Sequence, residues 1–220
     1  MMKKIATLLL CCFSILAATQ VSIAQPFINE IQKFRQQDSI SAPPANPIVF
    51  TGSSSFRMWK TVQQDFPGYT IINRGFGGSG IPHVIQYAED VIFKYNPKQV
   101  VIYCGENDLG PGVKGEYVSG KFIELFKLIR SRLPEVPIVY ISMKPSPRRE
   151  KVLDEMKKGN KQIKKFLRKQ KKAVYVDVFS AMLNADGSIR KDIFLDDNLH
   201  MNAAGYKIWQ PLVEKHLLKN

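Results

Sequence analysis

Five short apolar runs, separated by longer stretches with helical periodicity, constrain the fold of this chain more than any other feature. The four runs that flank the middle one are rich in β-branched and aromatic residues, and residues 100–103 of the middle run are all apolar. Continuous apolar character is typical of a parallel strand that is covered on both faces. Alternation of such strands with helices predicts βαβ units. The runs lie at 48–51, 69–73, 99–104, 138–142 and 173–178.

Helical periodicity fills the stretches between and after these runs, and one further helix is predicted before Pro43 and Pro44. Five parallel strands with right-handed crossovers favour the flavodoxin-like order 2-1-3-4-5. The sequence therefore predicts an α/β fold, a three-layer α/β/α sandwich with a five-stranded parallel sheet. In such a sheet ligands bind beyond the carboxyl ends of the strands. The helices are expected at 55–65, 80–94, 114–132, 148–170 and 202–218, after a first one that ends near residue 37.

The first 24 residues have the three parts of a secretory signal peptide. Lys3 and Lys4 precede an apolar run, which small residues follow up to Ala24. The run is shorter than the roughly 20 apolar residues of a membrane-spanning helix. We therefore expect cleavage after Ala24, export to the periplasm or the cell exterior, no stable membrane insertion after cleavage, and a single domain at 25–220.

Cleavage would leave one cysteine and a strongly basic chain. Cys11 and Cys12 would leave with the signal peptide, so Cys104 could form no internal disulfide. Two lysines and no acidic residue would be lost, and the net charge would fall from +13 to +11. Thirteen of the Lys and Arg residues lie at 144–172. A solvated helix face is the favoured interpretation of that segment. An exported module that binds a polyanion is the alternative, although the aromatic interleaving of a nucleic-acid groove is missing.

Small and polar residues follow each of the first three predicted strands. Ser54 lies in a serine-rich turn that opens a helix, where the hydroxyl could act as a nucleophile or, as the turn alone favours, cap the helix. The glycines at 75–78 suit either a ligand-binding loop or a simple turn. Asn107 could donate to an oxyanion or form an Asx turn.

A serine nucleophile needs a general base, and the chain has three histidines. Only His200 has a carboxylate, Asp197, three residues before it. His83 has no acidic neighbour within five residues, and His216 lies late in the last predicted helix. His200 is therefore the predicted base. No spacing of Cys, His, Asp and Glu predicts a metal site, and no cofactor is expected.

Taken together, four segments of the chain resemble the SGNH hydrolases, the GDSL-type esterase and lipase superfamily. Its four blocks occur in order: a nucleophile turn at 52–55, a glycine block at 75–78, a G-x-N-D block at 105–108 and a D-x-x-H block at 197–200. The similarity spans nearly all of the chain after the predicted signal. It departs from the family consensus at Ser53, where G-D-S enzymes have an acidic residue.

The resemblance implies a role for each matching residue. Ser54 would be the nucleophile, His200 the general base and Asp197 its orienting partner. The Ser54 N–H, Gly78 and Asn107 would form the oxyanion hole. The chain looks closest to the branch with platelet-activating-factor acetylhydrolase-like and carbohydrate-deacetylating members.

The activity that this resemblance implies is that of a secreted serine esterase working through an acyl-enzyme. Its substrates would be small-molecule or carbohydrate esters, and the lack of a long apolar lid favours short acyl groups such as acetyl. A lysophospholipase or thioesterase type of acyl hydrolase is the alternative within the same class.

Overall fold

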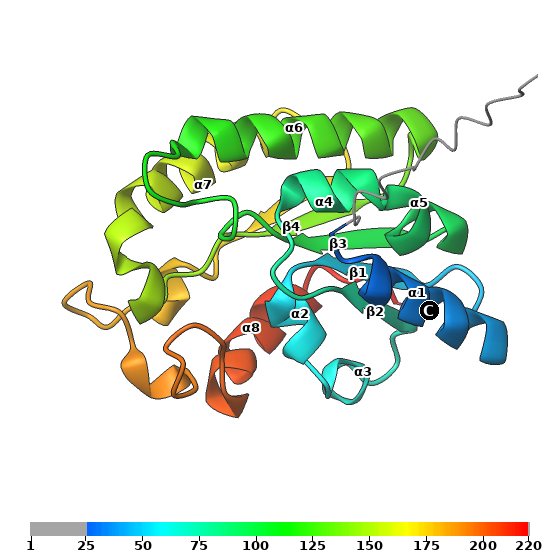
Figure 1. Ribbon diagram of the computed structural model, residues 1–220, viewed down its shortest axis with the longest axis horizontal. Coiled ribbons are helices and arrows are strands. Elements are labelled where there is room, and N and C mark those ends of the chain that lie inside the picture. Colours follow the sequence, from blue (N-terminus) through cyan, green and yellow to red (C-terminus); the bar gives the residue numbers. More distant parts are fainter. Residues whose placement is uncertain (1–25, 220) are drawn as a thin grey trace, which may run out of the picture.

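The structure, a computed structural model, describes residues 26–219 and contains one parallel five-stranded sheet (Figure 1). The strand order is β2-β1-β3-β4-β5, as predicted. The predicted signal peptide at 1–24 lies outside the described residues. The strands are β1 (Ile48–Gly52), β2 (Ile71–Gly75), β3 (Gln99–Tyr103), β4 (Ile138–Ile141) and β5 (Ala173–Val176).

Helices cover both faces of the sheet, so the predicted three-layer sandwich is confirmed (Figure 1). One face carries α4 (Ile81–Gln86), α5 (Ala88–Val91), α6 (Gly115–Arg132) and α7 (Leu153–Leu167). The other face carries α2 (Ser54–Met58), α3 (Val62–Asp65) and α8 (Ala203–Glu214). Helix α1 (Ile28–Ile40) packs against α5. Short 3₁₀ helices complete the chain: η1 (Phe93–Tyr95), η2 (Pro147–Val152), η3 (Ser180–Met182) and η4 (Lys191–Ile193).

Several predicted boundaries differ from the observed ones. The predicted helix at 55–65 is two short helices, because the chain turns between them to bury Trp59, whose indole donates to Asp65 at 2.6 Å. The predicted helix at 148–170 begins as the 3₁₀ turn η2, next to Pro147, and becomes α-helical only at Leu153. Strand β2 begins two residues later than predicted, since Tyr69 packs its ring against Phe66 before the strand starts.

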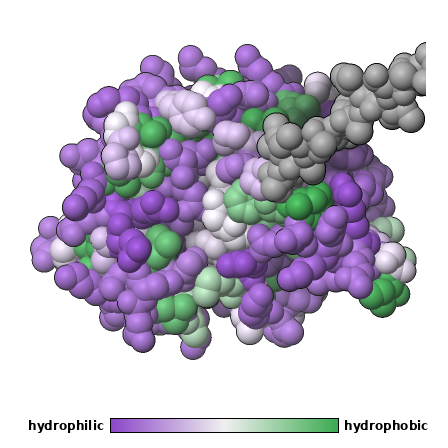
Figure 2. All heavy atoms as spheres, viewed as in Figure 1, coloured by the Kyte–Doolittle hydropathy of each residue, from purple (hydrophilic) through white to green (hydrophobic). Residues whose placement is uncertain are grey.

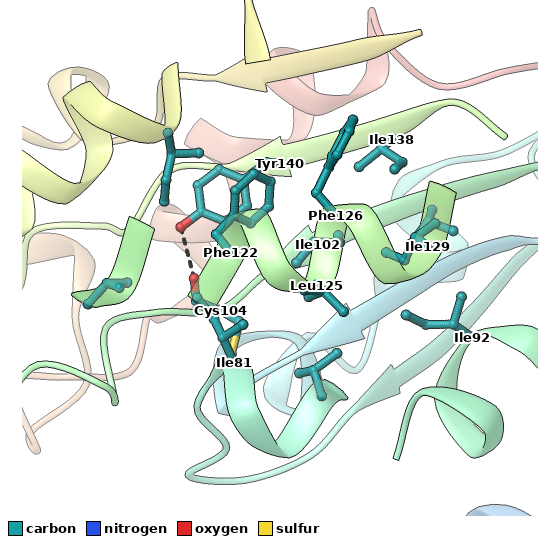
Figure 3. Close-up of a cluster of buried hydrophobic side chains, with 14 of the residues drawn as sticks. Ile81, Ile92, Ile102, Cys104, Phe122, Leu125, Phe126, Ile129, Ile138 and Tyr140 are labelled. Atoms are coloured by element: carbon teal, nitrogen blue, oxygen red, sulfur yellow. Dashed lines mark hydrogen bonds between the residues drawn. The ribbon is translucent and has the colours of Figure 1, made fainter. Parts of the chain in front are cut away.

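Each face of the sheet has its own apolar core. On the α6 side, the Phe122 and Tyr140 rings lie 4.4 Å apart between their centroids (Figure 3). The buried Tyr140 hydroxyl donates to the Cys104 carbonyl at 2.9 Å, so this phenol is satisfied although it has no access to water. On the other face, Trp59 and Trp209 are buried at the centre of the second core.

The outer surface differs in character from these cores. Hydrophilic side chains cover most of the face seen in Figure 2. Within residues 26–219, no helix combines the length and the apolar character that crossing a bilayer requires.

Gly52, the last residue of β1, sets the direction in which the chain leaves the sheet. Its φ of +133° lies in a region that L side chains rarely adopt. A Cβ at this position would lie 1.9 Å from the Tyr103 carbonyl oxygen, to which the Ser53 N–H donates at 2.9 Å. The backbone of β1 and the loop that follows it can therefore approach β3 only if residue 52 has no side chain.

We predict that Gly52→Ala destabilises the fold by at least about 2 kcal/mol, because backbone strain and a steric clash both apply. Urea unfolding of the purified variant measures this loss. Gly110→Ala is the matched control, since a Cβ at position 110 meets nothing within 4 Å. Equal stabilities of the two variants would contradict the argument.

Candidate active site

Three loops meet where β1, β2 and β3 end, and they are tied together by backbone hydrogen bonds. The Phe76 N–H donates to the Gly52 carbonyl at 2.9 Å, and the Ser79 hydroxyl donates to the same oxygen at 3.0 Å. Ser54 follows directly as the first residue of α2 and is 5% exposed. Its side chain is thus held at the carboxyl edge of the sheet with one small opening to solvent.

The general-base candidate reaches Ser54 from a loop 146 residues later in the chain. His200 Nε2 lies 2.9 Å from Ser54 Oγ, and His200 Nδ1 lies 2.5 Å from Asp197 Oδ2. An antiparallel bridge between Phe194 and Met201 closes this loop. The three side chains that the sequence selected are therefore connected in series, hydroxyl to imidazole to carboxylate.

Local hydrogen bonds fix the Asp197 carboxylate. Asp197 Oδ1 accepts from the backbone N–H groups of Leu199 at 3.0 Å and His200 at 2.9 Å. Partial burial alone would raise the pKa of Asp197, but the bonds from the His200 ring and from these two amides outweigh it and lower the pKa to about 2. The carboxylate is consequently ionised at neutral pH and holds His200 Nδ1 as a donor, which leaves Nε2 free to accept the Ser54 proton.

The groups expected to form an oxyanion hole lie in the three loops that meet at this edge of the sheet. No hydrogen bond to the residues described at 26–219 engages the backbone N–H of Ser54 or of Gly78. Gly78 has a φ of +75°, a conformation that favours glycine. Asn107 Nδ2 donates to the Ser79 carbonyl at 3.1 Å, which brings the amide of the third loop against the second.

Arg149 orients the Asn107 amide. Its Nη2 donates to Asn107 Oδ1 at 2.8 Å, which leaves the amide nitrogen, rather than the oxygen, to face the other loops. Asn107 is therefore bonded across loops and does not form the Asx turn that was its alternative. The bond from Arg149 to Asn107 was not predicted, since no sequence pattern pairs these two residues.

A buried ion pair lies at the base of the same loop. Lys144 Nζ is 2.9 Å from both carboxylate oxygens of Glu106, and neither side chain is more than 1% exposed. The Tyr103 hydroxyl donates to Glu106 Oε2 at 2.7 Å. A solvated face was the favoured interpretation of residues 144–172, and it is wrong for Lys144, which is completely buried. The available sequence signal was an acidic residue directly after an apolar strand, with a lysine after the neighbouring strand.

The serine-rich turn does not cap the helix. Ser53 occupies the N-cap position of α2, yet no side-chain cap bond forms, and its buried hydroxyl has no partner among the described residues. The capping interpretation is therefore wrong, and the turn instead presents the Ser54 hydroxyl to His200. Neither of the two other histidines is bonded to Ser54: His83 Nδ1 accepts from the Gly80 N–H at 2.9 Å, and His216 lies beyond α8.

A hollow of about 690 Å³ borders the oxyanion-hole candidates. Its wall includes Gly78, Asn107, His83, Lys114 and Tyr117. It could hold one part of an ester whose carbonyl oxygen faces Gly78 and Asn107. Among residues 26–219, no three His, Cys, Asp or Glu side chains gather where they could hold a metal ion.

A hydroxyl, an imidazole and a carboxylate in series, beside free N–H groups at the carboxyl edge of an α/β sheet, define a serine hydrolase type of site. The comparisons with known proteins agree with this class. The model of the GDSL-like lipase/acylhydrolase family matches residues 38–208. The chain belongs to this family and is a carboxylic ester hydrolase. No curated protein matches the sequence.

Solved structures share the fold at low sequence identity. A proposed platelet activating factor from Streptococcus pneumonia has 20% identity and a TM-score of 0.75, covering 86% of this chain and 92% of that one. A GDSL-like lipase from Bacteroides thetaiotaomicron has 20% identity and a TM-score of 0.70, covering 84% and 95%. A carbohydrate esterase family 3 protein from Talaromyces cellulolyticus has 15% identity and a TM-score of 0.61, covering 77% and 94%.

We predict that Lys144→Met destabilises the fold by about 3–5 kcal/mol, because Glu106 would remain buried without its cation. The double variant Lys144→Met/Glu106→Gln should lose less than the single variant. Urea unfolding measures both losses, and Lys165→Met, at an exposed position, is the control. A double variant that loses as much stability as Lys144→Met, or more, would contradict the coupling.

We also predict that Asp108 makes the free energy of unfolding depend on pH. Its carboxylate accepts from the Ile81 N–H at 3.0 Å. Burial raises the pKa of Asp108 from 3.8 to about 6. The folded chain therefore binds this proton more tightly than the unfolded chain. The contribution of Asp108 to the unfolding free energy declines as the pH rises from 3.8 to about 6 and then levels off. The decline is at most about 3 kcal/mol, at about 1.4 kcal/mol for each pKa unit.

Asp108→Asn removes this titration. The unfolding free energy of the wild type minus that of the variant should thus fall from about pH 4 to about pH 7. Urea unfolding at each pH measures both free energies. A difference that stays constant or rises over this range would show that Asp108 is not held protonated by burial.

Proposed function

We propose that this protein is an exported serine esterase that hydrolyses short-acyl esters, of carbohydrates or small alcohols, through an acyl-enzyme on Ser54. The observation that carries the proposal is the 2.9 Å separation of Ser54 Oγ and His200 Nε2, with Asp197 bonded to the other ring nitrogen. A serine hydroxyl is a weak nucleophile, and an adjacent base held by a third group is the usual means of activating it.

In the first half of the reaction, His200 Nε2 removes the proton of Ser54 Oγ as the oxygen attacks the ester carbonyl carbon. A C–O bond forms to Ser54, and the carbonyl oxygen becomes an oxyanion. The protonated imidazole is stabilised by the ionised Asp197. His200 then gives its proton to the departing alcohol oxygen as the original ester bond breaks.

The second half repeats these steps with water. His200 takes a proton from the water molecule, the resulting hydroxyl adds to the acyl carbon, and the proton returns to Ser54 Oγ as the acid leaves. The N–H groups of Ser54 and Gly78, with the Asn107 amide, are assigned to the oxyanion in both halves. Loss of one such donor typically costs about 10²–10³-fold in kcat.

The preference for short acyl groups and the exported location are further parts of the proposal. The described loops around Ser54 include no long apolar helix that could cover a lipid chain. The residue pattern at 1–24 supports export through a cleaved signal. A solved structure with the same fold is a carbohydrate esterase, which is why acetylated sugars are included among the proposed substrates.

We predict that Ser54→Ala lowers kcat/KM for p-nitrophenyl acetate by about 10³-fold or more, since no covalent intermediate can form. His200→Ala should cause a loss of similar size. Asp197→Ala should lose less, because Asp197 orients the imidazole without transferring the proton. Steady-state release of p-nitrophenol measures all three.

Ser53→Ala is the matched control, because it removes a hydroxyl from the same turn that has no hydrogen-bond partner among the described residues. It should retain turnover, and retained activity in Ser54→Ala would refute the assignment. A series of p-nitrophenyl esters from acetate to long acyl chains tests the acyl preference separately. Hydrolysis of long-chain esters alone would contradict the short-acyl part and leave the serine mechanism in place.

A further inference from the structure

A second hollow, of about 380 Å³, lies against the loop that follows Asn107 and has a basic wall. One side is the loop 109–114 that follows Asn107, and the other side comes from η2 and the start of α7. It shares Gly112, Val113 and Lys114 with the hollow that borders Gly78 and Asn107. The loop 109–114 therefore forms part of the wall of both hollows.

The cations of this wall outnumber the anions. Lys114, Arg148, Arg149 and Lys151 line it, against the single carboxylate of Glu155. That carboxylate is already engaged by Lys158 at 2.7 Å and by the Gly115 N–H at 2.8 Å. The wall thus carries an excess of positive charge that its own acidic residue does not neutralise.

Arg148 and Lys151 are the two cations of this wall whose side chains form no hydrogen bond or ion pair with the residues described at 26–219. Both are exposed, and neither side chain forms an ion pair within the part of the chain that the structure describes. They also line a neighbouring hollow, together with a third cation, Lys191. Its acidic residues are Asp196 and Asp197, and the Asp197 carboxylate is already bonded to His200. The Arg148 N–H donates to the Asn198 carbonyl at 3.0 Å, which fixes the backbone of this residue against the loop that carries His200.

Arg149 connects the basic wall to the reacting centre. Its Nη2 donates to Asn107 Oδ1, so the guanidinium lies between the oxyanion-hole candidate and the basic hollow. A group bound between Arg148 and Lys151 would consequently lie beside both the Asn107 loop and the His200 loop. A neutral ester would leave the positive charge at this place unused.

We propose that the preferred substrates are esters whose alcohol part carries a carboxylate or phosphate group, which binds between Arg148 and Lys151. The inference rests on the proposed function, because a short acyl group leaves the alcohol part as the only place for the charge. Charge-assisted hydrogen bonds to such a group are stronger than neutral ones. The anion leaves with the alcohol, so it affects acylation and not the hydrolysis of the acyl-enzyme.

The test compares three acetyl esters: 4-acetoxybenzoate, 4-acetoxyphenyl phosphate and the neutral methyl 4-acetoxybenzoate. The double variant Arg148→Gln/Lys151→Gln should lower kcat/KM by about tenfold for one or both anionic esters. For the neutral ester it should change kcat/KM by less than about twofold, since the reacting groups are untouched. The ratio of variant to wild type is taken for each ester, so that differences in leaving-group reactivity cancel. The two anionic arms distinguish a carboxylate from a phosphate preference.

Lys161→Gln/Lys165→Gln is the matched control, because it removes the same charge from exposed positions of α7 that do not line the hollow. It should leave all three ratios near one. Added salt should lower kcat/KM of the wild type for the anionic esters more than for the neutral ester. The rate of acetyl-enzyme hydrolysis, measured after a burst, should be the same in both double variants.

Equal effects of Arg148→Gln/Lys151→Gln on charged and neutral esters, or no effect on any, would overturn the anion site. In that case Ser54-dependent hydrolysis of the neutral ester would still uphold the serine esterase. If Ser54→Ala keeps the activity of the wild type, or if the wild type cleaves none of the esters, the proposed function itself fails and the anion site fails with it.

Discussion

The hydrogen bond between Ser54 Oγ and His200 Nε2 is the interaction on which the chemistry of this protein depends. It joins the start of α2, just after the first strand of the sheet, to a loop near the end of the chain. No short-range preference can create it. The sheet makes it possible, because parallel strands bring their carboxyl ends to one edge. The bridge between Phe194 and Met201 closes the last loop, and the Arg148 N–H, which donates to the Asn198 carbonyl, joins this loop to the segment after β4. The parallel sheet thus brings together the loops that carry the reacting side chains.

Backbone geometry at Gly52 and one buried ion pair position the loops that carry Ser54 and Asn107. Gly52 lets β1 approach β3 where a side chain could not fit, and the turn that follows carries Ser54. The Lys144–Glu106 pair lies at the base of the Asn107 loop with almost no exposure to water. Two buried charges are costly unless each satisfies the other, so the pair penalises any arrangement that separates them. Two interactions therefore fix the loop with Asn107: the ion pair between Lys144 and Glu106, and the hydrogen bond from Arg149 to Asn107.

The Lys and Arg side chains of the segment 144–172 lie in different environments, which the composition alone does not distinguish. Some cations of the segment 144–172, such as Lys165, lie on an exposed face of α7, as expected of a solvated helix. Lys144 is buried and serves the fold, whereas Arg149 is half-buried and bonds to Asn107. Neighbouring residues in one basic run thus differ completely in environment, because the 3₁₀ turn η2 and the strand end before it turn successive side chains in different directions.

The sequence by itself determined the sheet, its strand order and the three residues now found in series, because apolar runs and short motifs are local patterns that survive without coordinates. It selected Ser54, Asp197 and His200, which the structure joins by hydrogen bonds, because each follows a recognisable run or has its partner three residues away. Only the tertiary structure decided that Ser53 caps nothing, that Lys144 is buried against Glu106, and that Arg149 reaches Asn107. Those contacts join residues about 40 positions apart, and which side chains meet across such a separation depends on how the loops pack at the sheet edge.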